Sequence, residues 1–310
     1  MKIVVTGGAG FIASHIVDAY LKEGHEVHVI DDFSTGHKLN LNPSAVLHQF
    51  NVAGAEAASV ILKIKPDVLN HHAAQMDVRH SVEDPLFDAG VNILGFVNLL
   101  EACKKAGTAR VIFASSGGAI YGDEEPIPAD EDHPKKPMSP YGVSKMTGEL
   151  YLAYYYTAFG IGYVALRYAN VYGPRQSTTG EAGVVAIFIS QLLAERRPTI
   201  NGDGKQTRDY VFVGDVVKAN VAALQTSYVG GINIGTGRET DVVTLCRMLQ
   251  QRAHSKVEAL HGPAKTGEQM RSALEIALAG RVLDWQPEIG LEEGLTQTLA
   301  YYRKKSSHES

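Results

Sequence analysis

Short apolar runs and helix-spaced apolar positions alternate along the first half of the chain. Residues 2–5 form a β-branched run, and apolar residues within 12–21 then recur at helical spacing until Gly24. A second strand is predicted at 26–30. The alternation continues with predicted strands at 45–50, 67–71 and 110–113 and predicted helices at 55–64 and 91–106. Strands that alternate with helices predict a parallel, doubly wound α/β sheet, whose ligands bind beyond the carboxyl ends of the strands.

A glycine turn joins the first predicted strand to the first predicted helix. Gly8-x-Gly10-x-x-Ala13 fits the dinucleotide-binding fingerprint, and the same stretch read from Gly7 fits its close variant. Small residues let the backbone approach a pyrophosphate, which then lies at the positive end of the helix. Asp31 lies 21 residues beyond Gly10, where an acid accepts hydrogen bonds from the adenosine ribose and repels a 2′-phosphate. Together these features predict a Rossmann fold that binds NAD, and they disfavour a tight turn without a ligand.

A second candidate for chemistry is the pair Tyr141 and Lys145. Pro140 suits the first turn of a helix, so a helix is predicted from there through Ala153. Positions four apart lie on one helix face, which places the ammonium beside the phenol. A cation favours phenolate and so lowers the pKa of a tyrosine towards the range of a general base. A bare pair of this kind is also common on helix surfaces, so its weight depends on the rest of the chain.

The ends of the predicted strands carry small or polar residues, at 51–52, 73–75, 115–118 and 168–170. A proline-punctuated loop at 123–140 is expected to cover the opening that they form. Beyond Pro174 the alternation becomes irregular, and an apolar helix is predicted to begin at 183 and run to 193. We therefore expect a dinucleotide-binding domain of residues 1–174, with residues 209–236 interleaved, and a smaller mixed α/β substrate lobe within 175–310.

Composition narrows the possible partners. A net charge of -5 and a pI near 6.2 give no basic footprint for nucleic acid, so no nucleic-acid partner is predicted. No apolar run reaches the roughly 18 residues of a membrane span, so no membrane partner is predicted. Two cysteines cannot make a disulfide framework, which suits a cytoplasmic location. His71 and His72 are interpreted as packing at a cofactor wall, and no metal site is predicted.

Motifs in family order over most of the chain resemble the extended short-chain dehydrogenase/reductase family. They are TGGAGFI at 6–12, DDFSTG at 31–36, HAAQ at 72–75, SSGGAIYG at 115–122, the Tyr141/Lys145 pair, RYANVYGP at 167–174 and RDYVFVGD at 208–215. The resemblance is to the nucleotide-sugar branch of the family, and nearest to the UDP-glucose (UDP-galactose) 4-epimerases. It implies an NAD-dependent isomerase with a UDP-sugar substrate. It also implies a homodimer formed through helices corresponding to 91–106 and 141–159.

The resemblance implies a role for each matching residue. Tyr141 would take the proton of the sugar 4-hydroxyl while hydride leaves C4, and Lys145 would lower the pKa of Tyr141. Ser116 is the third candidate catalytic residue. The implied cofactor residues, besides Tyr141 and Lys145, are Gly7, Gly10, Phe11, Ile12, Asp31, Asp32, Phe33, Ser34, Thr35, Gly36, Asn51, Val52, Ala73, Ala74, Gln75, Asn92, Ser115, Tyr168 and Val171. The implied substrate residues are Ser116, Gly117, Tyr141, Asn170, Val184, Val185, Arg208, Lys265, Glu268 and Ser272.

Some positions depart from the family pattern or vary within it. Asn51 stands where the family usually has Asp and still fits a hydrogen-bonding role. Gly117 stands where the family carries a Ser or Thr that hydrogen-bonds the sugar 4-oxygen. Either Ser116 or an ordered water takes over this hydrogen bond, or the glycine turn has no catalytic hydroxyl. Lys265 replaces an arginine and keeps the charge without the bidentate fork. Ser272 is small where some epimerases carry a bulky residue beside the sugar, which predicts room for a 2-acetamido group. Arg208 has a second reading, as a surface arginine paired with Asp203 or Asp209.

Alternative functions remain within and outside this branch. Residues 115–118 lack the acids that related dehydratases and decarboxylases carry at this strand end, which favours oxidation and re-reduction at one carbon. A UDP-glucuronate 4-epimerase or another NAD-dependent nucleotide-sugar enzyme is the nearer alternative. A non-catalytic NAD-binding regulator is the more distant one, because Tyr141 and Lys145 are both present.

Overall fold

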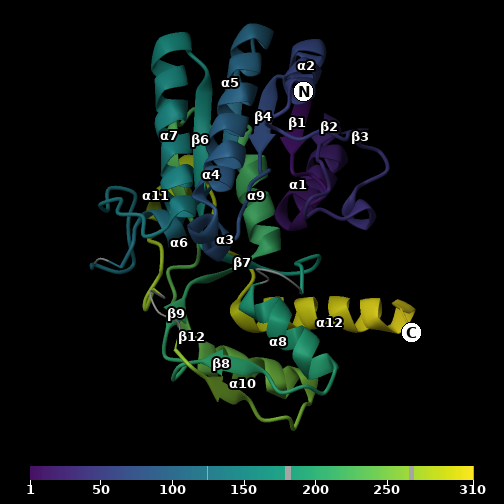
Figure 1. Cartoon of the computed structure of the whole chain (residues 1–310), viewed down its shortest axis with the longest axis vertical. Coiled ribbons are helices and arrows are strands. Elements are labelled where there is room, and N and C mark those ends of the chain that lie inside the picture. Colours follow the sequence, from purple (N-terminus) through teal and green to yellow (C-terminus); the bar gives the residue numbers. More distant parts are fainter. Residues whose placement is uncertain (124, 179–182, 265–268, 310) are drawn as a thin grey trace.

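Seven parallel strands form the main sheet of this computed structural model, which describes residues 1–123, 125–178, 183–264 and 269–309. Their order is β11-β6-β5-β4-β1-β2-β3 (Figure 1). Their bounds are β1 Lys2–Thr6, β2 Glu26–Ile30, β3 Val46–His48, β4 Val68–His71, β5 Arg110–Ser116, β6 Gly162–Tyr168 and β11 Gly230–Ile234. Each neighbouring pair is parallel, so the predicted parallel α/β sheet is confirmed.

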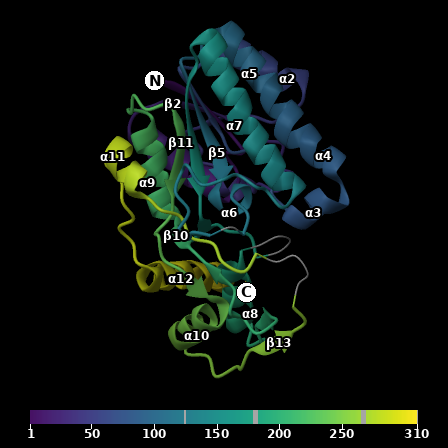
Figure 2. The ribbon, with the colours of Figure 1, turned by 90° about the vertical axis from the view of Figure 1, so that its left-hand side faces the viewer.

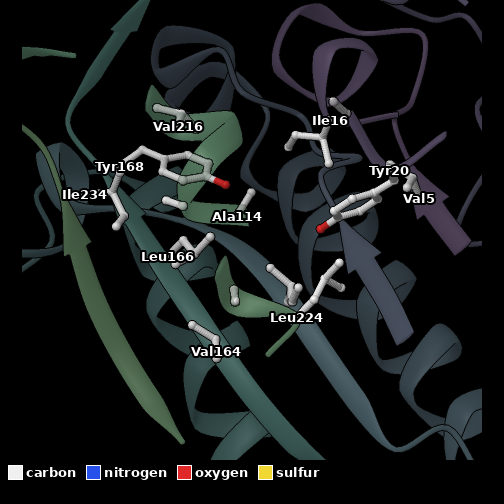
Figure 3. Close-up of a cluster of buried hydrophobic side chains, with 14 of the residues drawn as sticks. Val5, Ile16, Tyr20, Ala114, Val164, Leu166, Tyr168, Val216, Leu224 and Ile234 are labelled. Atoms are coloured by element: carbon white, nitrogen blue, oxygen red, sulfur yellow. The ribbon is translucent and has the colours of Figure 1, made fainter. Parts of the chain in front are cut away.

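Helices cover both faces of this sheet. One face carries α1 (Phe11–Lys22), α9 (Val213–Ala223) and α11 (Ala277–Leu283); the other carries α2 (Ala55–Ile64), α5 (Gly95–Ala106) and α7 (Pro140–Phe159) (Figure 2). The alternation of apolar side chains along each strand fills a separate core on each side. Figure 3 shows the α1–α9 core, in which Tyr20 of α1, Leu166 of β6 and Val216 of α9 come from three different elements. The sheet is therefore doubly wound, as predicted.

A smaller group of elements lies beyond the carboxyl ends of the strands (Figure 1). It contains α8 (Val184–Leu193), α10 (Val242–Ala253) and α12 (Leu291–Glu309), which share an apolar core. Its short strands pair in twos: β7 Asn170–Tyr172 with β10 Tyr210–Phe212, β8 Thr199–Asn201 with β13 Leu260–Gly262, and β9 Thr207–Arg208 with β12 Thr240–Asp241. The remaining elements are η1 Lys38–Asn40, α3 Val78–Glu83, α4 Pro85–Ala89, η2 Gly90–Leu94 and α6 Gly117–Ile120.

Several predicted boundaries were wrong. The strand predicted at 45–50 is shorter, because β3 is an edge strand that pairs only with three residues of β2. The strand predicted at 110–113 is longer, because the small residues Ala114 to Ser116 continue to pair with β6. The helix predicted at 91–106 begins earlier, since Pro85 opens α4 and Asp84 caps it through the backbone N–H of Phe87.

The helical stretch Pro85–Ala106 also contains a π-helical turn, η2, between α4 and α5. Such turns are frequent at functional sites, and this one directs Asn92 into the protein, where 4% of it is exposed. By length and composition alone, this stretch is the one in the described part of the chain that could cross a membrane, but 44% of its most apolar window is buried. Its other face leaves Leu86 and Leu94 exposed.

Candidate active site

The glycine turn after β1 forms a cradle lined by backbone. Gly7 has a φ of +69°, and a Cβ there would lie 2.8 Å from the backbone nitrogen of Ala73. A Cβ on Gly10 would lie 3.0 Å from the carbonyl oxygen of Gly7. Gly10 is the N-cap of α1, and no side chain among the described residues caps this helix. The turn therefore leaves room and helix N–H groups for an anion, so it fits the pyrophosphate of a dinucleotide.

Two acids after β2 organise the loop where the adenosine end is predicted. Asp31 is 7% exposed, and its carboxylate accepts hydrogen bonds from the backbone N–H groups of Ala9 (2.9 Å) and Phe33 (2.8 Å). Asp32 accepts a hydrogen bond of 2.8 Å from the Asn51 side chain. Asp31 thus ties the loop to the glycine turn, while each of its oxygens keeps a lone pair that a ribose hydroxyl can use.

Other predicted cofactor residues lie around the same two segments. Phe11 and Ile12 open α1, and Ser34, Thr35 and Gly36 continue the loop after β2. Val52 is buried in the core under α2 and α5. Further along, Asn92 and Gln75 clamp each other: Asn92 accepts from the backbone N–H of Gln75 at 2.9 Å and donates to its carbonyl at 2.8 Å. The clamp holds the Ala73–Ala74–Gln75 loop at the end of β4.

The helix that carries Tyr141 and Lys145 begins where the sequence predicts. Ser139 caps α7 by accepting from the backbone N–H of Gly142 at 3.1 Å, and Pro140 occupies its first turn. Lys145 is 4% exposed and donates to the carbonyl of Ala114 at 2.9 Å, and its Nζ lies 5.6 Å from the centre of the Tyr141 ring. The pair therefore meets on one helix face, directed at the end of β5.

The expectation that Lys145 lowers the pKa of Tyr141 is not met by the protein alone. Burial raises the pKa of Tyr141 to about 12, against a lowering by its hydrogen bond to Ser116. Burial lowers the pKa of Lys145 to about 8, against a raising by the charge of Asp88. Because both groups lose solvent, each shifts towards its neutral form. The spacing of Tyr141 and Lys145 in the sequence reveals the neighbouring charge but not the desolvation.

Ser116, at the end of β5, lies close enough to the Tyr141 phenol to lower its pKa. That the Ser116 hydroxyl serves in place of a side chain at position 117 stays a prediction. A Cβ on Gly117 would lie 2.5 Å from Cδ1 and 2.7 Å from Cδ2 of Leu274, so the space for a Ser or Thr side chain is filled by that leucine. The structure thus brings Ser116, Tyr141 and Lys145 together.

The side chains of Ser115 and Tyr168, two predicted cofactor residues, contact other residues of the protein. The Ser115 hydroxyl donates to Glu149 at 2.6 Å, and Glu149 forms a buried ion pair with Arg167 at 2.7 Å. The Tyr168 hydroxyl accepts from Asn220 of α9 at 2.8 Å. The Tyr168 hydroxyl also hydrogen-bonds to the His72 ring at 3.0 Å, which keeps this side chain next to the end of β4.

Several predicted substrate residues lie around α6 and the smaller lobe. A Cβ on Gly118 would lie 3.9 Å from Oδ1 of Asn170 and 4.0 Å from Oγ of Ser272, which places both side chains beside the end of β5. Arg208 lies in β9, where it donates to the carbonyl of Thr207 at 2.7 Å. Val184 and Val185 open α8, and Val185 packs into the core of the lobe. Val171 lies in β7. Lys265 and Glu268 lie outside the described residues.

Contacts between the two parts of the chain close around the site. Gln269 donates to the carbonyl of Gly122 at 2.6 Å. Arg271 bridges Glu125 of the loop at 123–140 and Glu239 beyond β11, at 2.7 Å to each. The loop at 123–140 therefore joins segments far apart in the sequence.

Two residues of the site have no motif to mark them. Leu274 excludes a side chain at position 117, and the fully buried Asp88 of α4 hydrogen-bonds to Ser144, next to Lys145. The one signal in the sequence is an acid within an apolar helical pattern, which is unusual for a helix buried on one face.

Comparisons with known proteins agree with this geometry. Residues 3–235 match the NAD dependent epimerase/dehydratase family. The chain is 43% identical over 312 residues to a UDP-glucose 4-epimerase of Mycolicibacterium smegmatis, covering 99% of this chain and 100% of the relative. A UDP-glucose 4-epimerase of Thermotoga maritima, solved with UDP-glucose, has a TM-score of 0.97 and 42% identity, over 99% of this chain and 100% of that one. A UDP-N-acetylglucosamine 4-epimerase of Methanobrevibacter ruminantium has a TM-score of 0.93 and 33% identity, over 98% of each chain.

Proposed function

The chain belongs to the NAD dependent epimerase/dehydratase family, and on that premise we propose that it interconverts UDP-glucose and UDP-galactose as a 4-epimerase, an isomerase. The observation that carries the proposal is the convergence of Ser116, Tyr141 and Lys145 at the end of β5, beside the glycine cradle. The acid-free segment 115–118 supports simple oxidation and re-reduction, because elimination or decarboxylation calls for an additional proton-transfer group.

Ser116, Tyr141 and Lys145 have separate roles in the proposed reaction. When bound, NAD⁺ supplies the hydride acceptor and a positive charge. With Tyr141 as the phenolate, the sugar 4-hydroxyl would lose its proton to the Tyr141 oxygen while the C4 hydrogen leaves with its electron pair for the bound NAD⁺, which would give a 4-keto sugar. Ser116 donates a hydrogen bond at the 4-oxygen, and Lys145 holds positive charge beside the phenol. When the keto sugar presents its other face and is reduced again at C4, Tyr141 would return the proton to the oxygen.

The smaller lobe, within residues 175–310, is proposed to hold the nucleotide and diphosphate. Arg208 offers a guanidinium suited to phosphate oxygens, and Asn170 lies beside Gly118 at the end of β5. The NAD-binding domain comprises residues 1–174 and the strand β11 within 209–236. Lys265 and Glu268 are proposed to complete the nucleotide site, from the resemblance alone.

Ser272 favours a second pair of substrates, UDP-GlcNAc and UDP-GalNAc. Its side chain is small, and its Oγ lies near Gly118 and Asn170, where the sugar is expected. A small residue there leaves volume for a 2-acetamido group. The likeness to a UDP-N-acetylglucosamine 4-epimerase supports this extension.

A cytoplasmic homodimer is the proposed assembly. Exposed apolar side chains line one face of α7 (Val143, Leu150 and Tyr154) and the adjoining helical stretch 85–106 (Leu86 and Leu94). The positions on α7 follow helical spacing, so they form a stripe that a second copy can cover. Both cysteines are free and buried, which suits a reducing compartment.

The test is conversion of UDP-galactose by the purified protein without added NAD, followed by chromatography of the sugar products and by absorbance of released NADH. We expect UDP-glucose to form without free NADH, and Tyr141→Phe to abolish the conversion. UDP-GalNAc offered in parallel tests the Ser272 argument, because turnover of UDP-galactose alone would reject it. No conversion of either sugar, even with added NAD, would reject the epimerase, and UDP-glucuronate would be offered next.

A further inference from the structure

Asp88 carries a fully buried carboxylate next to the catalytic pair, although no motif includes it. It lies in α4 and is 0% exposed. Its Oδ1 accepts from the side-chain amides of Asn92 at 2.9 Å and Gln75 at 3.1 Å, and its Oδ2 accepts from the Ser144 hydroxyl at 2.6 Å. A carboxyl group that only accepts hydrogen bonds has the pattern of an ionised carboxylate.

The three donors come from three separate parts of the site. Gln75 follows β4, Asn92 belongs to the π-helical turn η2, and Ser144 precedes Lys145 on α7. Gln75 and Asn92 already clamp each other through two further hydrogen bonds. Asp88 therefore connects the predicted cofactor wall to the helix that carries Tyr141 and Lys145.

Among the titratable groups that the structure describes around Lys145, Asp88 is the one that can act as its counter-charge. Lys145 contacts the Ala114 carbonyl and lies 5.0 Å from the centre of the Phe113 ring. His71 and His72 approach from the end of β4, and burial followed by the charge of Lys145 lowers the pKa of both, that of His72 to about 3, so both are neutral. Asp88 raises the pKa of Lys145, and it is the one anion that acts on Lys145 within the described part of the chain.

We propose that Asp88 is a positioning residue of the catalytic pair: it supplies the buried counter-charge that keeps Lys145 protonated, and it anchors α7 to the Gln75–Asn92 clamp. This role rests on the proposed function only in naming Lys145 as catalytic. A protonated Lys145 holds positive charge beside Tyr141. Asp88 on α4 therefore affects the reaction indirectly, by keeping Lys145 on α7 protonated.

Two variants separate the charge from the anchor. Asp88→Asn removes the charge, whereas Ser144→Ala removes the hydrogen bond to α7 and keeps the charge. The titration of Lys145 is followed by NMR of ¹³Cε-labelled lysine, with the signal identified by its loss in Lys145→Met. We expect Asp88→Asn to lower the midpoint by about one pH unit, and Ser144→Ala to leave it unchanged. The alkaline limb of the kcat/KM profile should move down in pH with the midpoint in Asp88→Asn only.

Asp215→Asn is the control for the general effect of neutralising a buried acid. Asp215 is 0% exposed and lies in α9, outside the catalytic site. If Asp88→Asn does not fold, Asp88→Ser provides the same loss of charge in a smaller side chain. An unchanged Lys145 midpoint in the folded neutral variant would overturn the proposal, as would a uniform loss of kcat/KM at every pH. The NMR titration needs no turnover, so failure of the epimerase assay would leave this result readable.

Discussion

Replacing Gly117 by serine tests why this chain lacks a side chain at the position of the family hydroxyl. The new Cβ would lie 2.5 Å and 2.7 Å from the two terminal carbons of Leu274, closer than real Cβ contacts. Leu274 is 1% exposed and packs with Ile120, Tyr121 and Ala129, so it has little room to move. Overpacking of this kind costs about 1–3 kcal/mol, and we expect Gly117→Ser to lower the free energy of unfolding by about 2 kcal/mol.

A compensating substitution makes the test specific. Leu274→Ala alone should cost about 3 kcal/mol, because it empties a buried site. The double variant should cost at least 1 kcal/mol less than the two single changes combined, roughly the coupling of residues that share one space. Urea denaturation of the four proteins supplies the cycle, provided that their m-values agree. Additive losses, or a Gly117→Ser protein as stable as the parent, would refute the account of Leu274.

Ser116→Ala, made in the parent and in the double variant, tests which hydroxyl serves Tyr141. In the parent, Ser116→Ala should lower kcat by about 100-fold, since one donor at the developing charge is lost. In the Gly117→Ser/Leu274→Ala background, the new hydroxyl at position 117 can substitute, and the loss should fall to about 10-fold or less. Parent kcat that survives Ser116→Ala would show that Ser116 is not the group.

Three further predictions follow from buried charge and exposed apolar surface. Because the pKa of Lys145 is lowered to about 8, the unfolded chain binds the proton more tightly between pH 8 and its ordinary 10.5, so this group adds stability as pH rises through that window. Lys145→Met should therefore remove this rise in the free energy of unfolding between pH 8 and 10.5 in urea titrations, and a rise of the same size in the variant would contradict the pKa. Glu149→Gln should cost about 3–5 kcal/mol by leaving Arg167 without its buried partner, and a change within error would mean that water enters there. Leu150→Glu together with Leu94→Lys should halve the mass measured by light scattering at unchanged melting temperature, whereas a parent that is already monomeric would reject the proposed dimer.

The fold was predictable because local signals agreed with one another. The β-branched run of β1, the glycine turn, the capped start of α7 at Ser139–Pro140 and the alternation of strands and helices all indicate the same layered sheet. The boundaries failed where tertiary pairing decides them, as in the short edge strand β3 and the extended β5. The lengths of β3 and β5 depend on these pairings, so the local sequence does not predict them.

The site was predictable where backbone geometry dictates residue type, and not where packing across the chain decides it. Gly7 and Gly10 could be recognised from the sequence, because a Cβ at either position would meet backbone atoms and only glycine fits. The effect of Leu274 on position 117 joins residues that are far apart in sequence, so spacing gives no sign of it. Asp88 also accepts hydrogen bonds from Gln75 and Ser144, which lie in other parts of the chain, so the local apolar pattern does not reveal its surroundings.

The shifts at Tyr141 and Lys145 define what else the reaction requires. With a pKa raised to about 12, Tyr141 is protonated at neutral pH despite its hydrogen bond to Ser116, so it is not a base in the protein alone. Positive charge placed beside a buried phenol favours phenolate, and the low local dielectric strengthens that effect. A cationic nicotinamide bound beside Tyr141 would therefore make it a better base, and a neutral one would make it a better acid. An epimerase needs both, because the same oxygen must take the proton in one half of the turnover and return it in the other.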